Sequence, residues 1–174
     1  KSPSRFDFKK LQNLSSKHIA AASNAALLQN ITNYQSANGA TPFTDAQLQR
    51  LDTAMYCLKE RAKTLPELIE KACFILQTRP ISIDEPAQAT LDSVFIGILQ
   101  SLTPQLQNAT WSREHLEVLF HEFVGSNGIK FGQLAAPLRA ALAGRKATPS
   151  VYDMMVLLGR DETIARIRDA IAES

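Results

Sequence analysis

The chain has 174 residues, 45% of them hydrophobic and 21% charged, which excludes an intrinsically disordered or fibrous protein. Nineteen basic and seventeen acidic side chains give a formal net charge of +2, so a polyanion would meet local basic patches and not a uniformly basic surface. No run approaches eighteen apolar residues and the start, KSPSRFDFKK, has no apolar core, which excludes a membrane-spanning helix and a signal peptide.

Apolar residues recur at helical spacing almost throughout the chain, and the alternation typical of strands is hard to find. The sequence therefore predicts an all-α protein. One predicted helix face comprises Leu91, Val94, Phe95, Ile98, Leu99 and Leu102. We expect helices over residues 7–22, 23–36, 44–62, 65–77, 85–107, 112–125, 130–143, 149–158 and 161–172.

Helix start and stop signals agree with these spans. Thr44 with Gln47, and Thr64 with Glu67, have the spacing of capping boxes. Thr148 and Pro149 are expected as an N-cap and first helical residue. Glycines follow four of the predicted helices, at Gly39, Gly128, Gly144 and Gly159.

A junction between two helical bundles is predicted at residues 78–86, TRPISIDEP, where two prolines interrupt the helical pattern. The charge balance changes at the same place. Residues 1–78 carry ten basic and six acidic side chains, whereas residues 79–174 carry nine and eleven.

Residues with catalytic or metal-binding potential are scattered along the chain. Cys57 and Cys73 lie in apolar stretches, and we interpret them as buried core thiols of a cytosolic protein. The three histidines form no metal-ligand pattern, and no nucleophile or phosphate-binding motif is present. The chain alone is therefore predicted to carry no active site.

Four positions remain as candidates for binding. Arg61 ends one predicted helix and precedes the next, and its alternative role is that of a surface arginine at a helix C-terminus. Arg139 lies in the alanine-rich AAPLRAAL, and its alternative role is an interhelical salt bridge. Thr148 and Pro149 are expected as a helix cap, whose free N–H groups could also meet a base edge or a phosphate.

The segment 130–171 contains a series of family-specific residues. They are Gly132, Gln133, Pro137, Leu138, Arg139, Ala141, Leu142, Gly144, Thr148, Pro149, Leu157, Leu158 and Gly159. This pattern resembles the C-terminal end of bacterial-type glutamyl-tRNA synthetases. Trp111 with the helix after it, the segment 61–76 and the start SPSRFDFKKLQNLSSKHI are similar to further segments of that family.

The resemblance implies the C-terminal part of a class I glutamate–tRNA ligase, folded as two consecutive helical bundles that form an α-helical cage. It implies a connection over residues 1–20, a first anticodon-binding subdomain over 21–78 and a second over 79–174. The HIGH and KMSKS signatures are absent, so ATP and Mg²⁺ would bind in a catalytic half upstream of Lys1, and no cofactor is expected in this chain. The implied partner is the anticodon arm of glutamate tRNA, bound by a cytoplasmic monomer.

The resemblance also implies roles for individual residues. Arg61 stands where the family reads the third anticodon base, cytosine in glutamate tRNA, and an arginine there favours discrimination against glutamine tRNA, which has guanine. The positions that contact the first and second bases are matched by Arg139, Thr148, Pro149 and Val151. Weaker candidates for tRNA backbone contact, whose alternative is an exposed polar residue, are Lys130, Gln133, Arg145 and Lys146.

An all-α protein-interaction module without nucleic-acid binding is the alternative function. It predicts an exposed apolar groove and weak salt dependence, whereas tRNA binding should weaken steeply with salt.

Overall fold

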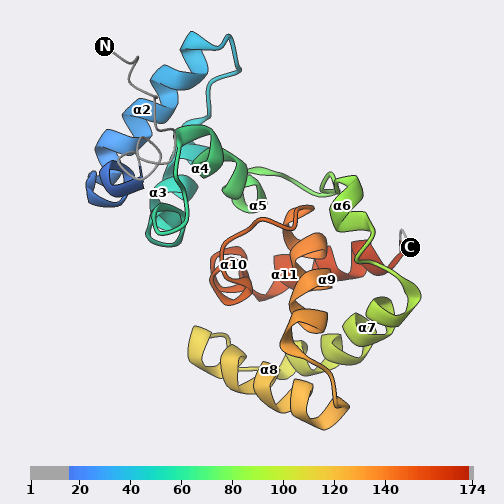
Figure 1. The fold of residues 1–174 in the computed structure, drawn as a ribbon. Coiled ribbons are helices and arrows are strands. Elements are labelled where there is room, and N and C mark those ends of the chain that lie inside the picture. Colours follow the sequence, from blue (N-terminus) through green and yellow to red (C-terminus); the bar gives the residue numbers. More distant parts are fainter. Residues whose placement is uncertain (1–15, 173–174) are drawn as a thin grey trace, which may run out of the picture. The chain divides into compact units, whose positions relative to one another are not determined.

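The computed structural model describes residues 16–172, and this part of the chain contains helices and turns but no strand (Figure 1). The all-α prediction is confirmed. The predicted helix 7–22 lies largely outside the described residues, and within them residues 16–21 are helical. None of the described helices is long and apolar enough to cross a membrane.

The chain divides into two compact units, Lys1–Ala72 and Cys73–Ser174, called here the first and second unit. In the described part of the first unit, α2 (Asn24–Ala37) packs against α3 (Asp45–Lys59) and α4 (Leu65–Lys71). Their shared core contains Leu27, Ile31, Leu51, Leu58 and Leu68. The predicted capping box at the start of α3 is confirmed, because the Thr44 N–H donates to the Gln47 side-chain oxygen (2.9 Å) and the Gln47 N–H donates to the Thr44 hydroxyl (3.3 Å).

The second unit contains seven helices within its described residues 73–172. They are α5 (Cys73–Leu76), α6 (Glu85–Gln88), α7 (Ser93–Asn108), α8 (Arg113–Asn127), α9 (Phe131–Ala143), α10 (Val151–Leu158) and α11 (Arg160–Ala172). The α9 helix, orange in Figure 1, contacts every other helix of this unit. Its alanine-rich sequence explains this central place, because small side chains let neighbouring helices approach closely, and Ala135, Ala140, Ala141 and Ala143 are all buried.

A buried arginine ties three helices of the second unit together. Arg166 of α11 is 3% exposed. Its guanidinium donates to the carbonyl oxygens of Phe74 (2.7 Å), Leu142 (2.6 Å) and Gln77 (2.9 Å), and to the Glu162 carboxylate (2.7 Å). These four hydrogen bonds use four of its five N–H groups, and three of the acceptors are carbonyl groups at the ends of α5 and α9.

Two predicted helices are broken in the structure. The predicted helix 65–77 is divided at Ala72 into α4 and α5. The predicted helix 85–107 is divided into α6 and α7, because Asp92 caps a new helix by accepting from the backbone N–H groups of Val94 and Phe95, both at 3.0 Å. The expectation that Val94 lies on the buried face was wrong, since its side chain is 66% exposed.

The division between the units falls after Ala72, earlier than the predicted junction at residues 78–86. The reason is that α5 packs against α9 and α10 of the second unit. Cys57 is buried as predicted, whereas Cys73 is only half-buried, with its thiol 3.4 Å from the carbonyl oxygen of Ala143.

Candidate functional site

Arg61 lies in the exposed turn between α3 and α4 of the first unit. The turn is held by a partial form of the predicted capping box. Thr64 accepts from the Glu67 N–H (3.3 Å), while the Glu67 carboxylate accepts from the Lys63 N–H (2.8 Å). Among residues 16–172, the Arg61 guanidinium has no hydrogen bond or ion pair, so a defined turn presents it to solvent.

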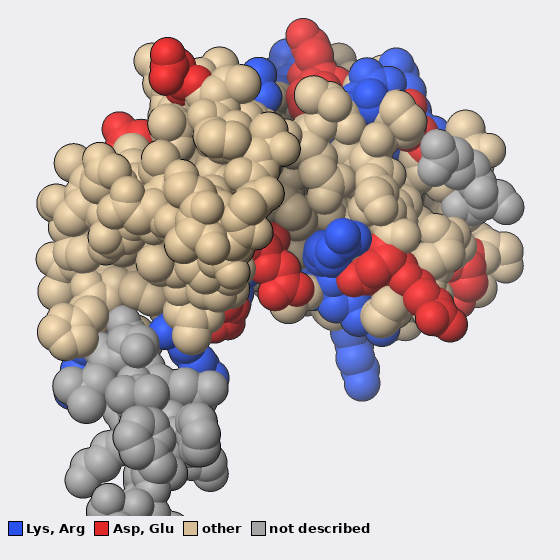
Figure 2. All heavy atoms as spheres, turned by 90° about the horizontal axis from the view of Figure 1, so that it is seen from above, with Lys and Arg blue, Asp and Glu red and all other residues tan. Residues whose placement is uncertain are grey.

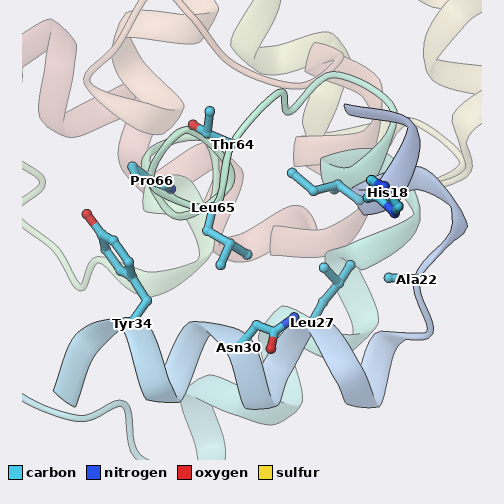
Figure 3. Close-up of a pocket in the computed structure, with 9 residues that line it drawn as sticks. His18, Ala22, Leu27, Asn30, Tyr34, Thr64, Leu65 and Pro66 are labelled. Atoms are coloured by element: carbon cyan, nitrogen blue, oxygen red, sulfur yellow. The ribbon is translucent and has the colours of Figure 1, made fainter. Parts of the chain in front are cut away.

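The same turn borders a cavity of about 550 Å³ in the first unit (Figure 3). Leu27, Asn30 and Tyr34 point into it from α2, and Leu65 points toward them from the start of α4. Its lining mixes apolar side chains with polar ones, among them Asn30, Tyr34 and Thr64.

The structure changes the expected roles of Thr148, Pro149 and Val151 in the second unit. The helix begins at Val151 with Ser150 as N-cap, so the expectation that Thr148 caps it was wrong. The Thr148 hydroxyl donates to the Pro149 carbonyl oxygen (3.0 Å) and is buried. Val151 is 1% exposed. Its methyl groups therefore pack in the core and offer no surface to a splayed base.

Arg139 and the four backbone-contact candidates occupy different settings. Arg139 is half-buried in the middle of α9, whereas the side chains of Lys130 and Lys146 are exposed. The Gln133 side chain is partly engaged, because its oxygen accepts from the Lys130 N–H (2.8 Å). Arg145 donates to the carbonyl oxygens of Ser82 (3.1 Å) and Gly144 (2.7 Å), so it holds the 82–84 segment in place.

Sequence reasoning missed a series of three aromatic rings that runs from the core of the second unit to its surface. We call Phe120, Tyr152 and Phe131 the aromatic series. The centroids of Phe120 and Tyr152 are 5.3 Å apart at 51°, and those of Tyr152 and Phe131 are 5.9 Å apart at 27°. Phe120 is fully buried, Tyr152 is half-buried and Phe131 is 41% exposed. An aromatic residue at the first position of α9 was the sequence signal that could have revealed it.

Charged groups surround the aromatic series. The Arg113 guanidinium lies 5.8 Å from the centroid of Tyr152 and pairs with Asp153 and with Glu117. Burial raises the pKa of the Tyr152 hydroxyl, with a further contribution from the negative charge of Glu117 that Arg113 opposes. The Tyr152 ring therefore stays neutral at physiological pH.

The surface charge is mixed, and Figure 2 shows basic and acidic side chains interspersed on the face in view. A polyanion would therefore not meet a uniformly basic surface on this face. Within residues 16–172, no group of three or more His, Cys, Asp or Glu side chains could hold a metal ion.

Comparison with known proteins identifies the family. Residues 9–171 match the family model described as the anticodon binding domain. The chain is 61% identical over 170 residues to glutamate–tRNA ligase 2 of Ruegeria pomeroyi and 56% identical over 170 residues to glutamate–tRNA ligase 2 of Roseobacter denitrificans. In both comparisons the match covers 98% of this chain and 36% of the relative, so the chain spans about a third of the relatives' length.

Solved structures agree with the family match. The crystal structure of a glutamate tRNA ligase from Elizabethkingia meningosepticum, in complex with its amino acid, superposes with a TM-score of 0.73 at 25% identity. That match covers 99% of this chain and 34% of the other chain. Glutamate-tRNA synthetase from Elizabethkingia anophelis gives a TM-score of 0.68, also at 25% identity, over 98% of this chain and 33% of that one. The chain therefore belongs to the anticodon binding domain family, in the form found in glutamate–tRNA ligases.

Proposed function

We propose that this chain is the tRNA-recognising part of a glutamate–tRNA ligase and that it binds the anticodon arm of glutamate tRNA. The observation that carries the proposal is the match of residues 9–171 to the anticodon binding domain family. The family match favours this function over the protein-interaction module. Attachment of glutamate to tRNA, with its ATP and Mg²⁺, would take place in the rest of the ligase, which we place in the cytoplasm as a monomer.

Arg61 is the proposed reader of the third anticodon base. Unpaired loop bases expose edges that a duplex hides, and an exposed side chain on a defined turn can reach them. A guanidinium only donates hydrogen bonds, so it suits the O2 and N3 acceptors of cytosine. Its exposure in the α3–α4 turn supports this role.

The second unit is proposed to contact the first two anticodon bases around Arg139 and the start of α10. Because the side chains of Thr148 and Val151 are buried, the proposed contacts there use the backbone. The Ser150 side chain makes no capping hydrogen bond, which leaves the first-turn N–H groups of α10 without that acceptor. Exposed Lys130 and Lys146 are suited to phosphate contacts.

The test is the relative affinity for anticodon stem-loops of glutamate and glutamine tRNA, measured with the original chain and with Arg61→Gln. We expect the substitution to reduce the preference for the glutamate loop by about 1–3 kcal/mol, the size of one lost base contact. Lys63→Gln is the matched control, because it removes a positive charge from the same exposed turn. Lys63→Gln should weaken binding to both loops equally. An unchanged preference of Arg61→Gln for the glutamate loop over the glutamine loop would refute the role assigned to Arg61.

A further inference from the structure

Val151, one of the positions matched to the first two anticodon bases, is buried, and an exposed apolar side chain in the same unit belongs to a different residue. Val151 is 1% exposed, whereas Phe131 is 41% exposed. The two positions are linked through Tyr152, which follows Val151 in α10 and stacks on Phe131 at a centroid distance of 5.9 Å. An aromatic ring is therefore presented beside the region proposed to meet the anticodon loop.

Neighbouring residues hold the Phe131 ring in place, although the core of the second unit does not need this ring. Phe131 is the first residue of α9. A hydrophobic staple at this helix start would join Ile129 to Leu134, so Phe131 is not required for it. Its stacking partner Tyr152 is itself packed against the fully buried Phe120, at 5.3 Å. The aromatic series thus anchors the exposed Phe131 ring to the interior of the second unit. The Phe131 side chain therefore has little conformational freedom left to lose when RNA binds.

We propose that Phe131, supported by Tyr152, is a stacking platform for an unpaired base of the bound anticodon loop. This inference rests on the proposed function. Base–aromatic stacking needs an exposed ring held in a fixed orientation and tolerates any base, because every base has a π face. The neighbouring Lys130 supplies an exposed positive charge for the phosphate backbone of the same nucleotide.

The charges near the platform are consistent with a neutral aromatic surface beside RNA. Asp153 and Glu117 are both paired with Arg113, which also lies over the Tyr152 ring. Arg113 thereby offsets one of the two negative charges, and the Tyr152 hydroxyl stays neutral because burial raises its pKa.

The experiment measures binding of the 174-residue chain to the glutamate anticodon stem-loop over a series of salt concentrations. Phe131→Ala should raise Kd by between about 5-fold and about 150-fold, the loss expected for one stacked base. The salt dependence should stay unchanged, because no phosphate contact is removed, whereas Lys130→Ala should reduce the salt slope by about one. Val118→Ala, an exposed apolar change on α8, is the control and should leave Kd unchanged.

Two further variants separate stacking from simple apolar contact and from misfolding. Phe131→Trp should retain or improve affinity, and its added emission should be quenched by bound RNA, whereas Phe131→Leu should lose affinity although it keeps an apolar side chain. Equal Kd values for Phe131→Ala and the original chain would overturn the platform and leave the proposed function intact. Absence of RNA binding by the original chain would overturn both.

Discussion

At the scale of single residues, Arg166 shows why a charged side chain can belong to the core. The Arg166 side chain is 3% exposed, and all of its hydrogen-bond acceptors lie within the second unit. Burying a charge costs free energy unless it is paired and hydrogen-bonded, and here both conditions are met. Removing the guanidinium would leave three carbonyl groups and the Glu162 carboxylate without their partner.

Arg166→Met keeps similar apolar bulk and removes these bonds, so we expect it to lower the free energy of unfolding by about 3–5 kcal/mol. Urea denaturation followed by circular dichroism measures the change. Arg168→Met is the control, because Arg168 is exposed on the same helix, and it should change stability by less than about 0.5 kcal/mol. Equal effects of the two substitutions would contradict the role of Arg166.

Tyr152 gives a prediction for alkaline pH. Burial raises the pKa of its hydroxyl above the usual value of about 10, so the folded protein keeps this proton to higher pH than the unfolded chain does. The stabilisation of the folded state by this pKa shift is fully present below the pKa of Tyr152 in the unfolded chain. It is lost as the pH rises through the pKa of Tyr152 in the folded protein. Tyr152→Phe should therefore lose less stability than the original chain between neutral pH and a pH above 10. Parallel losses in urea denaturation would show that Tyr152 does not contribute.

Single-residue roles could be predicted only in part from the sequence. Arg61 was predicted to end a helix, but α3 ends at Lys59 and Arg61 lies in the turn after it, while the Thr64 cap fixes where the next helix begins. The burial of Val151 could not be predicted. The segment VYDMMVLL is apolar on more than one side, and spacing does not show which side faces the core. The aromatic residue Phe131 at the start of α9 was visible in the sequence, but spacing does not show that Tyr152, which is far from it in sequence, stacks on it.

At the scale of elements, the end of α9 depends on the absence of a side chain at Gly144. This residue has φ +65°, and an added Cβ would lie 2.0 Å from the carbonyl oxygen of Ser82. The Gly144 carbonyl also accepts from the Asp84 N–H at 3.0 Å. Helix termination and docking of the 82–84 segment therefore require glycine at the same position.

Gly144→Ala should destabilise the protein by more than the 1–2 kcal/mol of a left-handed alanine, because the Cβ also meets backbone. The melting temperature is expected to fall by at least about 2–4 °C per kcal/mol. Gly128→Ala is a matched control, since Gly128 also ends a helix at φ +62° but has no atom within 4 Å of an added Cβ. Equal melting temperatures for both variants would contradict the clash at Ser82.

The sequence predicted which segments are helical better than it predicted where a helix is interrupted. The apolar spacing from Leu91 to Leu102 predicted one helix, but Leu91 is buried from the turn before α7 and not from the helix itself. The helical spacing of apolar residues therefore continued across a break between helices, which Asp92 creates by capping α7. The division at Ala72 was missed in the same way, because buried residues continue on both sides of it.

At the scale of the whole molecule, two helical units each have a core of their own, and the family match spans both of them. Arg61 lies in the first unit, whereas the other eight candidate residues and the aromatic series lie in the second. Base recognition is therefore proposed to use side chains from each of the two units.

The most direct test is a chemical footprint of the 174-residue chain on full-length glutamate tRNA. We expect protection of the anticodon loop bases, with weaker protection of the adjoining stem and none at the acceptor end. Arg61→Gln should remove protection of the third anticodon base, and Phe131→Ala should remove protection of one other loop base. Protection at the acceptor end alone, or no protection at any salt concentration, would contradict the assignment of this chain to anticodon recognition.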